Sequence, residues 1–558
     1  MGVIQNMELD PIAEHPIPID SPLWTLHARR FQIVLLIMIG FGGMVFMRAN
    51  IAFGMVCMIN STALSQSSQT TQKPKLFSPN FTQEIPISGC SAKVGGDGSP
   101  VMDYGGEITW EPDMQNLLFS AAFWGALAGI LPATPIVQHM PSHRLILGAI
   151  LIISGCSLLF PFFAVYVGFW STFISRFIMG FVESLVHPSI AALLSRWFPV
   201  EERSTAVALQ NTGLIIGMIL GPPLAGSLCA SSLRWPAIFF VAGAFGLLWS
   251  IFWGFLSSHS PDQDTRMGKI EKEYLTQNQS NPQAQKKRVS VPYVAIFLST
   301  PFWAINIVQF SLNLYATFIQ VYLPLFYKEV LYLDVVMNGV FVAVPYVVNG
   351  VFNVGYSIFI DRLKKSGKIT PTHAVKLSQF LANLGTGLAF VMIAWLADCS
   401  HANAILVILS FSSVFLAMFA SGMFTSLLSI APQYTATLCS MSLFPAMLGR
   451  LFCPYIVSVF RHAGTPEEWQ RILLLIGAFS LGTGVLFAIF GTADIQPWAL
   501  TDEGGKGFSF EAQNLKYAES RDLGRSQNIG RKDSRLPSGP VGFPSDLTTS
   551  VMSIDRAM

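Results

Sequence analysis

Apolar runs of about 20 residues recur along the whole chain, and no other feature restricts its fold as strongly. A run of this length crosses the hydrocarbon core of a bilayer as a helix, because only internal hydrogen bonds can satisfy its backbone there. Only 12% of the 558 residues are charged, against about 25% in soluble domains. The sequence therefore predicts an all-α membrane protein that crosses the bilayer many times.

The apolar runs fall into two groups of six, separated by the polar stretch 258–294. We expect one six-helix bundle at 31–257 and a second at 295–491, which is a plan common among transporters built from repeats. In such proteins the substrate site lies near the midplane, between the bundles. The twelve expected helices are residues 31–59, 113–137, 144–165, 168–193, 204–229, 236–257, 295–326, 335–361, 374–396, 402–427, 434–460 and 469–491.

Lysine and arginine are distributed unequally between the loops. An even number of spans places both termini on one side, and the loops of that side, chiefly 258–294 and 362–376, carry most of the basic loop residues. Such an excess marks the cytoplasmic side. We therefore expect the segment 1–30 and the tail 492–558 to be cytoplasmic. The tail is polar with little periodicity, so we expect it to be disordered.

The polar stretch 60–112 then forms a large loop on the outer side of the membrane. It contains two glycosylation acceptor sequences, at Asn60 and Asn80. Asn80 is the better candidate, since Asn60 lies almost at the membrane surface. We expect a glycoprotein, located in the plasma membrane or in a vesicular or lysosomal membrane.

Composition and motifs also exclude several classes of protein. A net charge of +2 without a basic patch argues against binding of nucleic acid. The sequence contains no HExxH, P-loop or GxSxG motif, so we expect no enzyme, cofactor or metal site. Spacing indicates neither a disulfide framework nor a zinc site, because no CxxC pair exists. Four of the seven cysteines lie within apolar runs: Cys57, Cys156, Cys439 and Cys453. The expected partners are the lipid bilayer and a small anionic substrate, and the expected state is a monomer.

Apart from residues at the helix ends, such as Asp361, four residues that are charged by default lie inside the spans: Arg48, Arg176, Glu183 and Arg450. Counted from the outer helix ends at about 1.5 Å per residue, the three arginines lie at similar depths, roughly 12–17 Å inside. Scattered structural arginines would not be expected to agree in depth. Charged groups in the membrane are costly and commonly mark functional sites.

The fourth span carries its polar residues on one face. Arg176, Gly180, Glu183 and His187 are separated by four, three and four residues, a spacing that aligns them along a helix. They could pair with other residues to lock helices together. Alternatively they line a cavity in which guanidinium groups bind an anion and a carboxylate exchanges a proton. Gly180 leaves room for a ligand or for a neighbouring helix, and His187 either modulates Glu183 or only fills volume.

The sequence "RFIMGFVESLVHPSIAALLSRWFPVEERS" resembles spans 4 and 5 of the anion:cation symporters of the major facilitator superfamily. That family includes vesicular glutamate transporters, sialin and type I sodium–phosphate cotransporters. The resemblance covers about residues 30–500, and it implies the major facilitator fold and secondary active transport of anions by alternating access. The matching residues are Arg176, Gly180, Glu183, Pro188, Trp197, Pro199, Glu202, Arg203 and Ser204, with Arg48 and Asn50 in the first span.

The chain departs from the family pattern at several positions. Gln138 and His139 stand where the loop after span 2 has an aspartate and an arginine, whose charges help to gate the transporter. In span 7, Gln309 replaces a histidine of sialin-like members and Leu312 an arginine of glutamate carriers, whereas Asn313 matches the sialin-like pattern. Specificity for glutamate or sialic acid is therefore not implied.

Arg450 does not follow from the resemblance, because the family more often has a small residue there. It lies near the middle of span 11, too deep to reach the headgroups easily. Three interpretations remain open at this point. Arg450 contributes to the anion site, in place of the arginine missing at Leu312; it forms a gate pair with Glu183; or it binds helix carbonyls around Pro454.

These observations favour a secondary active transporter of organic or inorganic anions, coupled to protons, sodium or membrane potential. The alternative is a membrane sensor that keeps the fold without transport, as the altered loop signature would allow; the retained arginines and Glu183 argue against it. The expected substrate-binding residues are Arg48, Arg176, Asn313 and Arg450, and the expected proton-coupling residues are Glu183 and His187.

Overall fold

The computed structural model describes residues 28–63, 93–94, 100–101, 104–199, 202–278 and 291–500. Within these residues, 12 helical stretches are long and apolar enough to cross a membrane. Their ends differ by only a few residues from those expected, so the all-α fold class is confirmed. The two short strands β1 (Lys93–Val94) and β2 (Pro100–Val101) form an antiparallel pair between the first two spans.

Most spans are single helices, but two in the second group are interrupted. The first six spans are α1 (Arg29–Met58), α3 (Pro112–His139), α4 (Ser142–Phe162) extended by the π-helix η1 (Phe163–Val167), α5 (Phe169–Trp197), α6 (Arg203–Ala230) and α7 (Pro236–Leu256). The uninterrupted spans of the second group are α12 (Val335–Lys365), α13 (Pro371–Trp395), α16 (Thr435–Phe460) and α17 (Pro466–Phe490).

Spans 7 and 10 change helix type along their length. Span 7 consists of α10 (Thr300–Thr317), the π-helix η3 (Phe318–Tyr322) and α11 (Leu323–Glu329). Span 10 consists of α14 (Ala402–Leu416), the 3₁₀-helix η5 (Ala417–Phe419), the π-helix η6 (Ala420–Phe424) and α15 (Thr425–Ser429). Turns of π-helix inside longer helices are frequent at functional sites. The shorter helices are η2 (Pro261–Gln263), α8 (Lys269–Asn278), α9 (Tyr293–Leu298), η4 (Cys399–His401), η7 (Pro432–Tyr434) and α18 (Pro497–Leu500).

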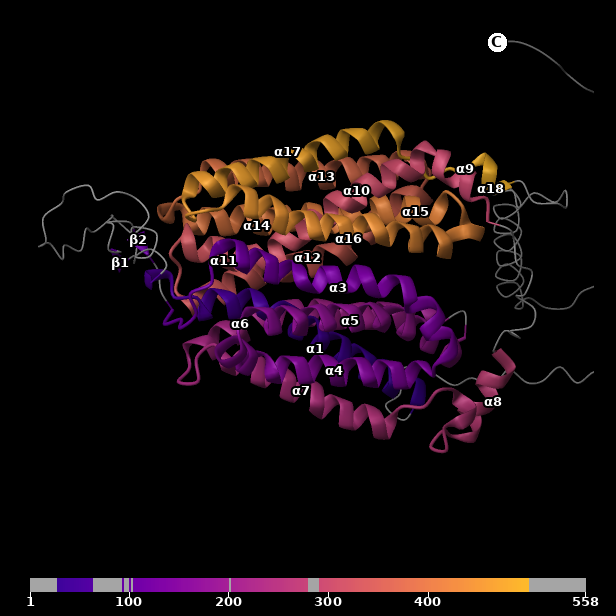
Figure 1. Ribbon diagram of the computed structural model, residues 1–558. Helices are drawn as coiled ribbons and strands as arrows, with labels where there is room; N and C mark the ends of the chain where they lie inside the picture. The colour runs from indigo at the N-terminus through magenta and orange to yellow at the C-terminus, as the bar shows by residue number, and fades with distance from the viewer. Residues whose placement is uncertain are drawn as a thin grey trace, which may run out of the picture. The chain divides into compact units, whose positions relative to one another are not determined.

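The two groups of spans repeat one packing pattern (Figure 1). In the first group α1 packs on α6, α3 on α5 and α4 on α7; six spans later α10 packs on α16, α12 on α14 and α13 on α17. The groups meet where α6 packs on α12 and α3 on α16. This correspondence is typical of transporters built from internal repeats. The domain boundaries drawn at 258–294 and beyond stay predictions.

A disulfide joins the ends of α1 and α6, which corrects the expectation from cysteine spacing. Cys57 and Cys229 are bonded although 172 residues separate them in sequence. The expectation was wrong because spacing detects cysteines that are close in the chain, whereas this pair is brought together by helix packing. Cys399, which lies between spans 9 and 10, is disulfide-bonded as well.

A buried charge network ties α8 to the beginning of α1. The carboxylate of Glu271 accepts hydrogen bonds from the backbone N–H groups of Arg29 and Arg30, and from Nε of Arg30 at 3.1 Å. Asp264 pairs with Arg29 at 3.0 Å, and Arg30 also contacts Glu202. A carboxylate at the N-terminus of a helix satisfies otherwise unpaired N–H groups. Part of the stretch 258–294 is therefore anchored on the first six spans.

Candidate functional site

An ion pair lies deep within the first group of spans. Arg48 of α1 donates from one guanidinium nitrogen to the carboxylate of Glu183 on α5 at 2.8 Å, and the two side chains are 16% and 14% exposed. A second nitrogen of Arg48 is 3.5 Å from the side-chain oxygen of Gln320, which lies on η3 in the other group. The pair thus joins α1 to α5 and also contacts the second half of the protein.

Arg176 occupies a different environment from Arg48, although both were predicted to bind the anion. It is 2% exposed, and its guanidinium donates to the side-chain oxygen of Asn50 at 3.2 Å and to the backbone oxygen of Met47 at 3.5 Å. The same group lies 5.3 Å from the centre of the Phe160 ring. Among the described residues, no carboxylate forms an ion pair with Arg176. Its positive charge is therefore held by neutral groups of α1.

Gly180 separates Arg176 from Glu183 along α5, and the space beside it is occupied by α3. A Cβ atom added at Gly180 would lie 1.8 Å from the backbone oxygen of Ala122. No side chain fits in this position, because the two backbones are already in contact. Of the two interpretations of Gly180, the structure therefore favours the neighbouring helix over a ligand.

Arg450 and Asn313, both predicted to bind substrate, are in direct contact. Arg450 on α16 donates from Nε to the side-chain oxygen of Asn313 on α10 at 3.0 Å. The Arg450 charge also acts electrostatically on Arg48 and Glu183. The proposed gate pair of Arg450 with Glu183 is not formed in this conformation, in which Glu183 binds Arg48.

His187 lies one turn from Glu183 on the same face of α5. Its ring contacts Phe41 edge-on, with 5.0 Å between the ring centres. The side chain is exposed, and the charges of Glu183, Arg48 and Arg450 all act on it. His187 therefore lies near Glu183, as its helical spacing predicts. Its role in proton coupling stays a prediction.

Exposure along this face of α5 shows from which direction the site is reached. We call the side on which α1 ends and α3 begins the loop side, and the opposite side the terminal side. Arg176, nearer the loop side, is buried; Glu183 is partly exposed; His187 and then Ala191, toward the terminal side, are exposed. This face of α5 is thus more exposed toward the terminal side than toward the loop side.

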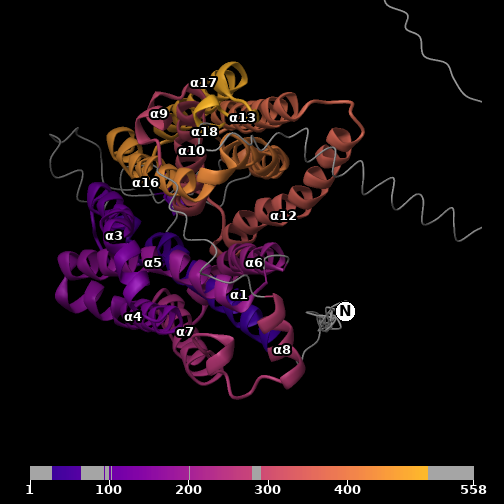
Figure 2. The same cartoon turned by 90° about the vertical axis from the view of Figure 1, so that its right-hand side faces the viewer.

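The hydrogen bonds that join the ends of the two halves lie on the loop side. Lys328 donates to the backbone oxygen of Val56 at 2.8 Å, Tyr322 to Asn116 at 3.2 Å, and the hydroxyl of Ser458 to a carboxylate oxygen at the start of α3 at 2.7 Å. In the part of the chain that the structure describes, the terminal ends of the two halves exchange no comparable hydrogen bond. Figure 2 shows these ends, with α1, α5 and α6 on one side and α10, α13 and α16 on the other.

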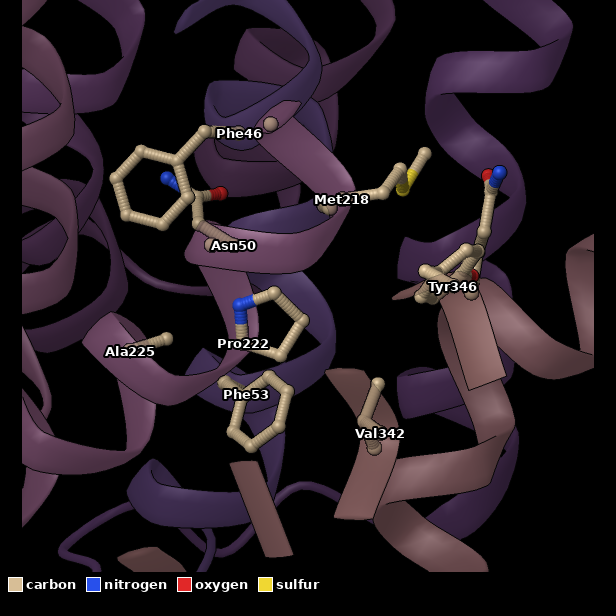
Figure 3. Close-up of a pocket in the computed structure, with 12 residues that line it drawn as sticks. Phe46, Asn50, Phe53, Met218, Pro222, Ala225, Val342 and Tyr346 are labelled. Atoms are coloured by element: carbon tan, nitrogen blue, oxygen red, sulfur yellow. The ribbon is translucent and has the colours of Figure 1, made fainter. Parts of the chain in front are cut away.

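An apolar pocket lies between α1 and α6 of the first half and η3 and α12 of the second (Figure 3), and Gln320, which lines it, is 3.5 Å from Arg48. About 350 Å³ inside it, part of which is open to the exterior, is not filled by atoms. Its polar lining residues are Asn50, Gln320 and Tyr346. The apolar lining residues are Phe46, Ala49, Phe53, Gly217, Met218, Gly221, Pro222, Ala225 and Val342.

Gln320 and Tyr346 were missed by the sequence reasoning. Each is a polar residue within an apolar run, a signal weaker than a charge because amides and phenols occur in spans for many reasons. Nothing in the sequence indicates that a π-helix would turn Gln320 toward Arg48. Among the described residues, no cluster of three His, Cys, Asp or Glu side chains could hold a metal ion.

Comparison with known proteins adds independent information. Residues 87–444 match the family model of the Major Facilitator Superfamily. The chain is 38% identical over 494 residues to the uncharacterized transporter slc-17.3 of Caenorhabditis elegans, covering 86% of this chain and 91% of that protein. It is 24% identical to human sialin, over 85% of this chain and 92% of sialin. It is 26% identical to bovine vesicular glutamate transporter 2, over 73% of this chain and 69% of that protein.

Solved structures show the same fold at low sequence identity. The inward open xylose transporter XylE from E. coli superposes with a TM-score of 0.58 at 12% identity, covering 86% of this chain and 98% of that one. A bacterial homologue of the lysosomal transporter Spinster superposes with a TM-score of 0.56 at 11% identity, covering 83% and 96%.

Proposed function

The chain belongs to the Major Facilitator Superfamily, and from its site we propose that it is a secondary active transporter of anions that works by alternating access. The observation that carries this proposal is the Arg48–Glu183 ion pair, which lies in the middle of the spans and is reached from the terminal side. The anion-handling relatives sialin and vesicular glutamate transporter 2 support the choice of substrate class. The sensor alternative has no comparable support.

Neutralisation of charge within the ion pair explains how binding of an anion can be coupled to binding of a proton. With the site empty, Glu183 neutralises Arg48. Leaving one member of a buried pair uncompensated costs about 3–5 kcal/mol. A substrate anion can therefore bind Arg48 favourably when Glu183 takes up a proton, because the total charge of the site is then unchanged. Proton and anion binding become linked, and each promotes the other.

Arg450 and Arg176 supply further positive charge around this pair. Arg450 approaches from the second half, held by Asn313, so an anion on Arg48 would be attracted to both halves at once. That attraction favours closure of the halves around the loaded site. Arg176 contributes long-range attraction from its buried position, since neutral groups hold it. His187 lies beside the route of the proton from the terminal side.

The test is uptake by purified protein in liposomes, with a panel of radiolabelled anions and separately imposed pH, sodium and voltage gradients. We expect uptake of at least one organic anion to be accelerated by a pH gradient that is acidic on the substrate side. Sodium alone should have no effect. Uptake that responds to sodium and not to pH would contradict coupling through Glu183, and absence of transport of every anion would contradict the proposed function.

We further propose that both termini face the cytoplasm and that the loop side faces the exterior or the lumen of an organelle. Disulfides form in oxidising compartments, and the Cys57–Cys229 bond lies on the loop side. The loops rich in lysine and arginine lie on the terminal side, which agrees with this orientation. The site is built from one chain, so a monomer is sufficient for transport.

Glycosylation offers a direct check of this orientation. The side-chain oxygen of Asn60 accepts a hydrogen bond from the backbone of Ala63 at 2.8 Å, and Asn60 is half-buried, so it is a poor acceptor. Asn80 lies outside the described residues. We expect Asn80→Gln to remove the gel shift produced by glycosidase, and Asn60→Gln to leave it unchanged. A shift that persists in the double variant would contradict the proposed orientation.

A further inference from the structure

The C-terminal end of α1 finds its hydrogen-bond partners outside the helix. A helix leaves its last four carbonyl oxygens without a donor from its own backbone. The carbonyl of Met58 accepts from the backbone N–H groups of Glu107 and Ile108, in the loop that follows α1. The carbonyl of Val56 accepts from the ammonium of Lys328 at 2.8 Å, and Lys328 belongs to α11 in the second half. The end of α1 is thus completed by the other half of the protein.

The positive charge of Lys328 suits this position. The carbonyl end of a helix carries a partial negative charge, which a nearby cation stabilises. The last turn of α1 contains no basic residue of its own, so Lys328 supplies the cation. Lys328 is 3% exposed, so its ammonium is held away from water while the two halves are in contact. The contact is therefore a helix cap that exists only while the halves meet on the loop side.

Tyr104 forms a matching contact from the first half to the second. It lies four residues before Ile108, whose backbone is hydrogen-bonded to the end of α1, so it is positioned by the first half. Its ring centre lies 5.2 Å from the ammonium of Lys328, within the range of a cation–π interaction. Its hydroxyl donates to the backbone oxygen of Leu333, between α11 and α12. Each half thus places one side chain on the other, and the two side chains meet.

We propose that Lys328 and Tyr104 form a latch that holds the loop side closed and so sets the conformation in which the empty transporter rests. This inference rests on the proposed function, because it assumes that the halves separate on the loop side during the cycle. A contact shifts a conformational equilibrium by the difference in its free energy between the two states. The latch contacts are lost when the loop side opens, whereas within the described ranges the terminal ends of the halves exchange no comparable hydrogen bond. The latch therefore favours a resting state that is open on the terminal side.

Lys328→Met should weaken the latch without disturbing the spans. Methionine has a similar length, but it donates no hydrogen bond and carries no charge. With the loop side closed it leaves the carbonyl of Val56 buried without its donor, which is costly, whereas water satisfies the same carbonyl when the loop side is open. The substitution therefore penalises the closed state alone. Tyr104→Leu removes the aromatic ring from the other half and should act in the same direction.

The separation of the halves can be measured in lipid nanodiscs as the distance between two spin labels, by electron paramagnetic resonance. The labels are attached at Leu233→Cys and His462→Cys, exposed positions on the loop side of the first and second halves, in a chain whose free cysteines are replaced by serine. We expect a single short distance to predominate when the latch is intact. Lys328→Met should raise the share of longer distances at least about fivefold, and Tyr104→Leu should raise it at least about twofold.

The matched control is Lys376→Met. Lys376 also donates to a backbone carbonyl, that of Ile489 at 3.0 Å, but both residues lie in the second half and on the terminal side. Its loss should leave the share of longer distances unchanged. An unchanged share in Lys328→Met, or an equal increase in Lys376→Met, overturns the inference. Both results are obtained without substrate and leave the proposed function standing, whereas absence of transport in the uptake test contradicts that function without altering these distances.

Discussion

Glu183→Gln is expected to abolish accumulation of anions driven by a pH gradient while leaving exchange of anion for anion in place. Glutamine keeps the size of the side chain and can still accept a hydrogen bond from Arg48, but it cannot take up a proton. A gradient of one pH unit, coupled to one proton, supports accumulation of about tenfold. In the variant the internal anion concentration should rise only to the external concentration. Counterflow should continue, because the anion still moves between the two sides.

Liposome uptake with and without a pH gradient measures the first effect, and counterflow of labelled against unlabelled anion measures the second. Asp361→Asn is a suitable control, since Asp361 is an exposed acid at the terminal end of α12 that pairs with Lys364. It should behave as wild type. Accumulation that still follows the pH gradient in Glu183→Gln would place proton coupling on another residue.

Arg48→Ala and Arg176→Ala are both expected to reduce anion uptake, but for different reasons, although both arginines lie in the same region. Arg48 is partly exposed and paired with Glu183. Its removal should reduce uptake by about 100-fold, since loss of one partner of a close charge pair costs several kcal/mol of binding free energy. Glu183 is partly exposed and can take up a proton once Arg48 is absent, so no uncompensated charge remains and the melting temperature should change little.

Arg176→Ala should instead lower both transport and stability. The substitution removes a buried side chain and leaves the oxygens of Asn50 and Met47 without their donor, at a cost of about 1–3 kcal/mol. The melting temperature should therefore fall by several degrees. Arg176→Lys keeps the charge but loses the planar fork. Its uptake and its melting temperature should lie between those of the wild type and those of Arg176→Ala.

Thermal unfolding in detergent, followed by intrinsic fluorescence, measures the difference in stability between these variants. Arg144→Ala is the control for loss of an exposed arginine, and should leave both melting temperature and uptake unchanged. If Arg48→Ala destabilises the protein as much as Arg176→Ala does, the ion pair is structural and the assignment of Arg48 to the anion site is wrong.

The sequence predicts the spans well because hydropathy and helix length are set by the bilayer. The shared face of Arg176, Glu183 and His187 is equally predictable, since it follows from helical spacing alone. The hydrogen-bond partners of these side chains cannot be predicted in this way, because they depend on the orientation of α1 relative to α5. A count of residues places three arginines at one depth, but it cannot tell that Arg48 pairs with Glu183 and that Arg176 is held by an amide.

Irregular helices mark a second limit of sequence reasoning. The break at η3 brings Gln320 beside Arg48. Pro324, at the start of α11, indicates an interruption of the helical hydrogen bonds, but it indicates neither a π-helix nor the direction of Gln320. The Cys57–Cys229 bond was missed for a related reason, since it depends on the packing of α1 against α6. Both features require knowledge of tertiary contacts, which hydropathy does not contain.

The Cys57–Cys229 bond has a consequence for how the two halves share movement. It fastens α1 to α6 on the loop side, while the contacts of Arg29 and Arg30 with α8 fasten the other end of α1. In the second half two spans change helix type along their length, at η3 and at η5–η6, whereas the π-helix η1 of the first half only extends the end of α4. We therefore expect the first six spans to move largely as one rigid unit during transport, and bending to be concentrated in spans 7 and 10. The two halves share one packing pattern, but we expect them to deform to different extents.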